Sequence, residues 1–310
     1  MKNKKRGLLL LAVLTTLLLT LSGCGFPGLN SSTDNTVRIA ALNTTEQQII
    51  AAIDKGMIEH YTPLKVSIIN NLGSSNVSFA ALKRGDADLS AARYNGTDLT
   101  DILGKTTSHN TKKDSAIVKR EFQDKYHLTY LPTYGFADTY AWMVTKQTAK
   151  KDHLNTVSDL KKYAPQMTVG VEQAWINRKG DGYTDFKKMY GFSFGKVYPM
   201  QIGLVYDSLA AGKMDAVLGY STDGRIGSYN LKLLKDDRQF FPPYYASPVA
   251  TNKILKQHPE LKTVLKRLGG KISLKTMQQL NYQVDNDLEE PEVVANKFLK
   301  AHNYFEGSDN

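Results

Sequence analysis

The sequence of 310 residues predicts an α/β fold built from βαβ units. Short runs rich in β-branched residues alternate with longer segments of helical periodicity. This order is typical of parallel strands connected by crossover helices, with helices on both faces of the sheet. A chain of this length is long enough to form two α/β lobes.

The expected elements follow one another after residue 35. Residues 37–41 alternate as a strand, and Thr45-Glu46-Gln47-Gln48 opens a helix that extends to about Tyr61. Further along we expect a strand at 64–69, a helix at 74–84 that stops at Gly85, a strand at 87–92, an exposed polar helix within 107–125, strands at 129–132 and 140–145, and a second α/β unit at 168–218.

The two halves of the chain share a local pattern at residues 82–97 and 209–224. In each, a helix ends on glycine, a short apolar strand follows, and a tyrosine comes at the carboxyl end of that strand. These tyrosines are Tyr94 and Tyr220. Open α/β sheets bind ligands at this edge, so two such lobes would form a cleft. The alternative is that the likeness reflects only a common helix-to-strand sequence.

The first 24 residues predict a lipoprotein signal. Basic residues precede a mostly apolar run, and Leu21-Ser22-Gly23-Cys24 contains the only cysteine. We expect residues 1–23 to be the signal peptide, Cys24 to be the acylated first residue, and 24–35 to be a flexible tether. The protein would then be extracytoplasmic and lipid-anchored to the cell membrane. The alternatives are an uncleaved membrane anchor and a reactive or buried cysteine.

The charge of the chain does not indicate nucleic acid binding. Loss of the signal peptide, with its four basic residues and no acids, would lower the formal net charge from +10 to +6. The remaining basic residues are spread through Lys-rich segments, without the interleaved aromatics of single-strand binders. A solvated basic surface is the simpler interpretation.

The residues of catalysis and metal binding are poorly represented. The sequence contains no His-Glu-x-x-His and no phosphate loop. Its six histidines are scattered without ligand spacing, so we expect no metal site and no cofactor. We therefore expect no enzyme activity. A lipid-anchored hydrolase remains an alternative, with Ser74 or Ser221 as the only candidate nucleophile.

Tyrosine, in contrast, occurs 17 times, and several of these residues fall in loops. Several aromatic rings around one point bind a quaternary ammonium group through their negative faces. The alternative for any single tyrosine is that it packs the core and keeps a wet hydroxyl.

Five segments resemble the substrate-binding lipoproteins of osmoprotectant ABC transporters, the glycine betaine/carnitine/choline group. These segments are residues 89–99, 132–136, 198–206, 219–225 and 240–244. The resemblance extends over residues 36–305. It implies a type II periplasmic-binding-protein-like fold, with two lobes joined by two crossovers and a ligand cleft between them. It also implies a membrane permease and a cytosolic ATPase as partners.

The resemblance implies a cage for the trimethylammonium head made of Tyr94, Tyr140, Tyr220 and Tyr244. Thr97 matches a position where related binders of narrower choline preference carry an acid. A neutral threonine would instead tolerate the carboxylate of a zwitterion and offer a hydroxyl donor.

The carboxylate of a zwitterion also needs donors, and the helix start at Ser74-Ser75 could offer backbone N–H groups. Ser74 could instead serve only as a helix cap. The chain departs from the family pattern at two positions. Leu42 stands where a polar side chain is expected, and Asp138 stands where asparagine is usual.

We therefore expect residues 36–138 and 244–310 to form lobe 1 and residues 139–243 to form lobe 2. The expected function is capture of glycine betaine, carnitine or choline and delivery to the permease. The alternatives are a binding protein for another small zwitterion such as an amino acid, and a surface lipoprotein without a transport role. An amino-acid site would use an arginine such as Arg93 or Arg225, to which we assign structural roles instead.

Overall fold

The computed structural model describes residues 35–108 and 110–305. The predicted signal peptide, Cys24 and most of the predicted tether lie outside these residues. The described residues from Val37 onward form one unit by their internal contacts. Among the described residues, no helix combines the length and the apolar content that a membrane span requires.

The first of two five-stranded sheets has the strand order β2-β1-β3-β10-β4. Its strands are β1 (Thr36–Leu42), β2 (Lys65–Leu72), β3 (Leu89–Tyr94), β4 (Leu128–Tyr130) and β10 (Ala246–Thr251). The accompanying helices are α2 (Thr45–Tyr61), α3 (Ser75–Arg84), α4 (Asn95–Thr97), η1 (Asp98–Ile102), α5 (Thr111–Tyr126), α10 (Asn252–Gln257), α11 (Glu260–Lys266), α12 (Leu274–Asp285) and α13 (Pro291–Ala301).

The second sheet has the order β7-β6-β8-β5-β9. Its strands are β5 (Tyr140–Thr145), β6 (Thr168–Glu172), β7 (Lys196–Met200), β8 (Ala216–Tyr220) and β9 (Leu231–Leu233). The helices of this part are α6 (Lys146–Lys151), η2 (Ser158–Lys162), η3 (Ala164–Gln166), α7 (Tyr183–Tyr190), α8 (Ile202–Ala210) and α9 (Arg225–Ser228). The predicted second α/β unit at 168–218 is therefore confirmed.

Both faces of each sheet are buried, as the α/β prediction requires. In β1, Ile39 packs into a core with α2, α11, α12 and α13, whereas its neighbour Ala40 packs on the other face with Phe122 of α5. In β5, Trp142 and Met143 belong to different cores in the same way. Successive strand residues point to opposite faces, so this alternation requires helices on both sides.

Each sheet is mixed rather than purely parallel, which the sequence did not predict. β1 and β3 are parallel, as are β6, β7 and β8, but β10 is antiparallel to β3 and β4, and β5 is antiparallel to β8 and β9. β5 and β10 are each the first strand along the chain after it crosses from the other sheet, and each is antiparallel to both of its neighbours.

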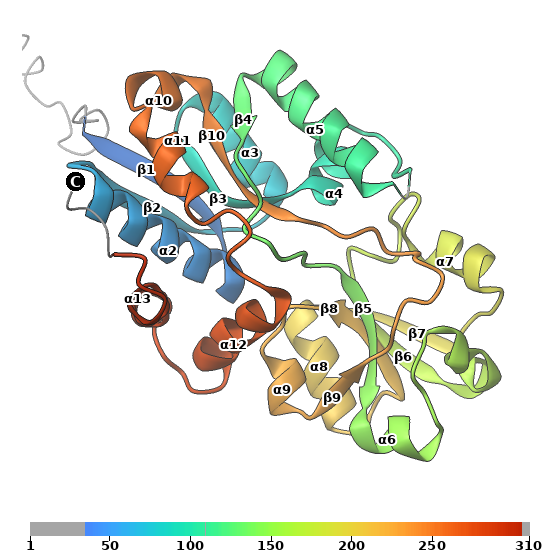
Figure 1. Cartoon of the computed structure of the whole chain (residues 1–310). Helices are drawn as coiled ribbons and strands as arrows, with labels where there is room; N and C mark the ends of the chain where they lie inside the picture. Colours follow the sequence, from blue (N-terminus) through green and yellow to red (C-terminus); the bar gives the residue numbers. More distant parts are fainter. Residues whose placement is uncertain (1–34, 109, 306–310) are drawn as a thin grey trace, which may run out of the picture. The chain divides into compact units, whose positions relative to one another are not determined.

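Two segments connect the sheets, one between β4 and β5 and the other between β9 and β10. They run side by side, drawn in green and orange in Figure 1. Ala137 forms an antiparallel bridge with Tyr245, and the Asp138 N–H donates to the Tyr244 carbonyl at 3.1 Å. These bonds hold the two connections together where the chain passes between the sheets.

Most predicted elements agree with the structure to within a few residues. Gly85 ends α3 in the left-handed conformation at φ 78°, as a C-terminal glycine should. The expected exposed helix at 107–125 is partly wrong, because it begins at Thr111 and buries Val118 and Phe122. Its apolar stripe is only two turns long, and the many charged residues around it hide the periodicity.

Candidate functional site

A pocket of about 640 Å³ is lined by residues from both sheets and their connections. All seven residues predicted to contact a ligand line this pocket: Tyr94, Tyr140, Tyr220, Tyr244, Thr97, Ser74 and Ser75. A volume of this size is typical of a site for a small organic molecule.

Tyr140 contacts two of the other three tyrosines. Its ring centroid lies 5.5 Å from that of Tyr220 and 6.4 Å from that of Tyr244, and its ring is perpendicular to the latter. Tyr140 and Tyr220 are direct partners in the antiparallel pair of β5 and β8. Tyr94 comes from the other sheet, as the last residue of β3. The tyrosines at the carboxyl ends of β3 and β8 thus line one pocket, as predicted.

A buried hydroxyl fixes the backbone of Tyr220. The Tyr220 N–H donates to Oη of Tyr206 at 2.7 Å, and Tyr206 lies on α8 with no exposed surface. Gly219 makes this contact possible, because a Cβ at that position would lie 2.6 Å from the same hydroxyl oxygen. The position of Tyr220 is therefore set by the packing of α8 on β8.

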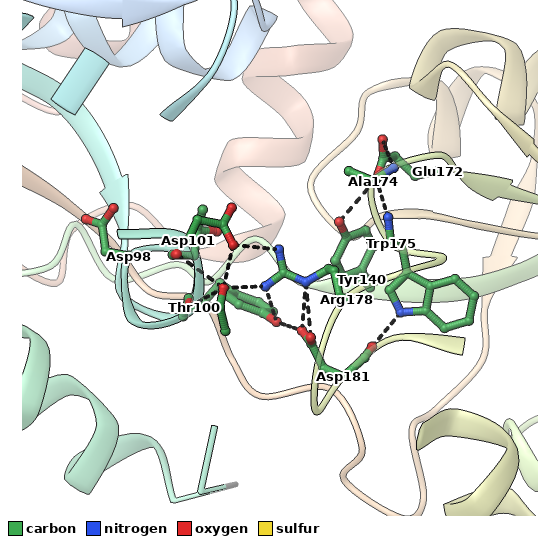
Figure 2. Close-up of polar contacts among 12 residues, drawn as sticks. Asp98, Thr100, Asp101, Tyr140, Glu172, Ala174, Trp175, Arg178 and Asp181 are labelled. Carbon is green, nitrogen blue, oxygen red and sulfur yellow. Dashed lines mark hydrogen bonds and ion pairs between the residues drawn. The ribbon is translucent and has the colours of Figure 1, made fainter. Parts of the chain in front are cut away.

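Arg178 is a pocket residue that sequence reasoning missed. Its guanidinium lies 5.8 Å from the ring centroid of Tyr140 and 5.6 Å from that of Tyr244, so it packs against two rings of the pocket. Figure 2 shows this guanidinium between Asp101 and Asp181, with nitrogen–oxygen distances of 3.6 Å and 3.1 Å. Arg178 therefore brings a fixed positive charge to the pocket.

The start of α3 forms another part of the pocket wall. Ser74 is the N-cap of this helix, and its Oγ accepts from the Val77 N–H at 3.3 Å. The structure thus shows the capping role that the sequence left open. Ser75, Thr97 and the apolar Leu42 also line the pocket. A helix N-terminus with hydroxyl side chains offers hydrogen-bond donors to an anionic group.

Burial raises the pKa values of three acidic residues of the pocket, Glu46, Asp138 and Asp285. Burial raises the pKa of Glu46 to about 7, although the Tyr94 hydroxyl donates to its Oε1 and opposes this shift. Burial and the nearby Glu46 carboxyl raise the pKa of Asp138 well above its ordinary value. The departure at Asp138 thus adds an acidic group to the pocket lining.

The family of substrate binding domains of ABC-type glycine betaine transport systems matches residues 35–301. The chain belongs to this family. Carnitine transport binding protein OpuCC of Listeria monocytogenes is 52% identical over 303 residues, which cover 96% of this chain and 98% of that protein. The protein is thus a substrate-binding protein of an ABC importer.

Two further comparisons agree with this family. A solved structure described as a glycine betaine/carnitine/choline ABC transporter is 55% identical, with a TM-score of 0.80, and covers 87% of this chain and 100% of its own. The two mixed sheets thus form a type II periplasmic-binding-protein-like fold. An ergothioneine transport permease/binding protein of Helicobacter pylori is 33% identical, covering 96% of this chain but 53% of that protein.

Family membership bears on the other predictions as well. The relatives are transport binding proteins rather than enzymes. Substrate-binding proteins of ABC importers are extracytoplasmic, in agreement with the predicted location. Neither the family nor the structure addresses lipidation, because Cys24 lies outside the described residues.

The two arginines considered in the sequence differ in their surroundings. Arg93 is 2% exposed, pairs with Asp98 and donates to the Ser75 carbonyl at 3.1 Å, so it joins η1 to the start of α3. This matches its predicted structural role. Arg225 pairs with Asp223 at 2.7 Å but also lines the pocket.

Proposed function

We propose that this protein captures a quaternary ammonium osmoprotectant, namely glycine betaine, carnitine or choline, and delivers it to an ABC permease. The observation that carries the proposal is the convergence of Tyr94, Tyr140, Tyr220 and Tyr244 on one pocket. Each aromatic face over a desolvated ammonium contributes about 0.5–2 kcal/mol. Four such faces would provide most of the recognition of a group that has no hydrogen-bond donor.

The carboxylate of a zwitterionic ligand would bind at the other polar groups of the pocket. Ser75 and Thr97 offer hydroxyl donors, the first turn of α3 offers N–H groups, and Arg178 offers charge. Because the Oγ of Ser74 already accepts from Val77, the contribution of Ser74 would be to fix this turn.

In this proposal, residues 36–138 with 244–310 and residues 139–243 act as two lobes that close on the ligand. The support is that the strands of each sheet fall within one of these groups and that two hydrogen-bonded connections join the sheets. Hinge closure about such connections is the usual motion of this architecture. The lipid anchor at Cys24 would keep the protein close to the permease.

Calorimetric titration of the protein from residue 25 onward tests the proposal. Glycine betaine, carnitine and choline are the principal ligands, with ergothioneine included because one relative is named for it. We expect binding of at least one quaternary ammonium compound, weakened by Tyr140→Ala. A flat response to all four compounds would overturn the proposed function, and binding of amino acids instead would favour the alternative zwitterion site.

A further inference from the structure

Three pocket tyrosines donate their hydroxyls to three different buried carboxylates. Tyr140 donates to Oε2 of Glu172 at 3.2 Å, Tyr244 donates to Asp181, and Tyr94 donates to Oε1 of Glu46. The carboxylates come from β6, from the segment before α7 and from the first turn of α2. All three are less than one-tenth exposed.

Glu172 and Asp181 have other partners that offset their charge. The N–H groups of Ala174 and Trp175 donate to Glu172 at 2.9 and 3.1 Å, and Arg178 pairs with Asp181. Figure 2 shows both arrangements. A carboxylate with several donors is stable in a buried site without a ligand.

Glu46 differs because its hydrogen-bond partners are neutral side chains: the Tyr94 hydroxyl donates to Oε1, and Thr222 and Asn281 lie near the carboxyl. Its second oxygen, Oε2, has no hydrogen-bond partner among the described residues, and Glu46 is 5% exposed while lining the pocket. No described lysine or arginine forms an ion pair with it. Leaving a buried carboxylate without a counter-charge is costly, so a cation in the pocket would stabilise its ionised form.

The other ionisable groups around Glu46 do not supply that counter-charge. Asp138 and Asp223 repel it, and both line the same pocket. Arg225 is paired with Asp223 at 2.7 Å, and Asp285, at the end of α12, accepts from Thr45. This end of the pocket is therefore acidic.

We propose that Glu46 positions Tyr94 by accepting a hydrogen bond from the Tyr94 hydroxyl, and that the Glu46 carboxylate gives the pocket a preference for positively charged ligands. The proposal rests on the proposed function, since it concerns the same pocket. The ionised carboxylate that accepts from the Tyr94 hydroxyl attracts a cation in the same pocket, and the attraction is strong where water is excluded. A neutral glutamine would hold the tyrosine but not attract the cation.

Asp54 provides a matched control on the same helix. It accepts from the Tyr134 hydroxyl at 2.8 Å, has no exposed surface, and also has one oxygen without a partner among the described residues. The residues that line the pocket do not include Asp54. Asp54→Asn therefore repeats the chemical change of Glu46→Gln away from the ligand.

The test is calorimetry with choline on the wild type, Glu46→Gln and Asp54→Asn, at pH 6 to 8.5 and in two buffers of different ionisation enthalpy. Because choline would favour ionised Glu46, the wild type should release up to about half a proton on binding near pH 7. Its affinity should rise with pH. Glu46→Gln should bind choline about tenfold more weakly at pH 8 and release fewer protons, while Asp54→Asn should behave as the wild type does.

The outcomes separate the two proposals. Absence of choline binding by the wild type would overturn both. Choline binding with unchanged affinity and proton release in Glu46→Gln would overturn this inference alone, as would an equal loss in Asp54→Asn. A loss of affinity in Glu46→Gln without a change in proton release would overturn the proposal that the charge of Glu46 attracts the cation. It would leave Glu46 with a packing role only. Absence of proton release from a wild type that binds choline would overturn the inference without any variant, so the inference can be refuted even if Glu46→Gln folds poorly.

Discussion

Gly96 lies directly against the ring of Tyr244. A Cβ atom at position 96 would come within 1.9 Å of Cδ1 and 2.0 Å of Cε1 of that ring. Gly96 follows β3 of the first sheet, whereas Tyr244 lies in the connection that returns from the second sheet. The glycine in Tyr94-Asn95-Gly96-Thr97 thus makes room for another tyrosine of the same pocket.

This contact predicts that Gly96→Ala will weaken ligand binding strongly. The methyl group has no space beside the ring, so Tyr244 must move out of the pocket or the two segments must separate. We expect the affinity for a quaternary ammonium compound to fall at least tenfold, as measured by calorimetry. A thermal melt should show that the variant is folded. Wild-type affinity in a folded Gly96→Ala protein would contradict the prediction.

The hydrogen-bond partners of the tyrosine hydroxyls predict that substitution by phenylalanine will change the ligand affinity to a different extent at each of the four positions. Tyr94→Phe removes the hydroxyl that donates to the buried Glu46, at a cost of about 1–3 kcal/mol. Tyr244→Phe should cost less, because Asp181 keeps Arg178 as a donor. Tyr220 lines the pocket without a carboxylate partner among the described residues, so Tyr220→Phe should bind nearly as the wild type does. Calorimetry on the Phe variants measures how much each hydroxyl contributes to ligand affinity, and calorimetry on the Ala variants measures the contribution of the whole ring with its hydroxyl. Equal behaviour of all the Phe variants would show that the carboxylates are unimportant.

The sequence predicted the parts of the site that lie at the ends of strands. Tyr94 and Tyr220 end β3 and β8, where strand periodicity stops and open sheets bind ligands. Tyr140 and Tyr244 required the family resemblance, because nothing local in the sequence shows that the connections between the sheets bring them together.

Arg178 and Glu46 show why the rest could not be predicted. Arg178 lies in a turn after β6 with no periodic pattern, and its contacts with Tyr140 and Tyr244 connect residues far apart in sequence. Glu46 lies in the first turn of α2, where an acidic residue is expected for helix stability alone. Its contact with Tyr94 depends on how α2 packs beside β3, which local sequence does not specify.

Arg178→Lys should distinguish zwitterions from simple cations. Lysine keeps the charge but loses the planar fork that contacts Asp181, Thr100 and the Tyr244 hydroxyl. If Arg178 faces the ligand carboxylate, glycine betaine affinity should fall about tenfold and choline affinity should change less. Calorimetric titration with glycine betaine and with choline measures the ratio of the two affinity losses. An equal loss for both would indicate that Arg178 acts only by holding the pocket together.

Cys24→Ala should release the protein from the membrane without changing its ligand affinity. The predicted role of Cys24 is to accept the lipid, and a protein without its acyl chains loses that anchor. Membrane fractionation, followed by calorimetry on the released protein, measures both effects. A variant that stays membrane-bound after signal removal, or that fails to fold, would contradict the lipoprotein prediction.

The raised pKa of Glu46 predicts that its ionisation destabilises the ligand-free protein as pH rises. Its ordinary value is 4.5, and burial raises it to about 7 in the folded state. Between these values the folded protein holds a proton that the unfolded chain has released, so the free energy of unfolding falls as pH increases through this window. Glu46→Gln cannot titrate and should lack this contribution.

Urea unfolding of the wild type and Glu46→Gln from pH 4 to 8.5 measures the effect. The stability of the wild type relative to the variant should decrease by roughly 1–3 kcal/mol between about pH 4.5 and 7.5. Asp159 provides a control of opposite sign, because hydrogen bonds from the Asn155 and Thr156 backbones lower its pKa. The stability that ionised Asp159 contributes is lost as pH falls. Asp159→Asn should therefore remove a small pH dependence of the free energy of unfolding, at acid pH only. A pH-independent difference between the wild type and Glu46→Gln would mean that the pKa of Glu46 is the same in the folded and unfolded states.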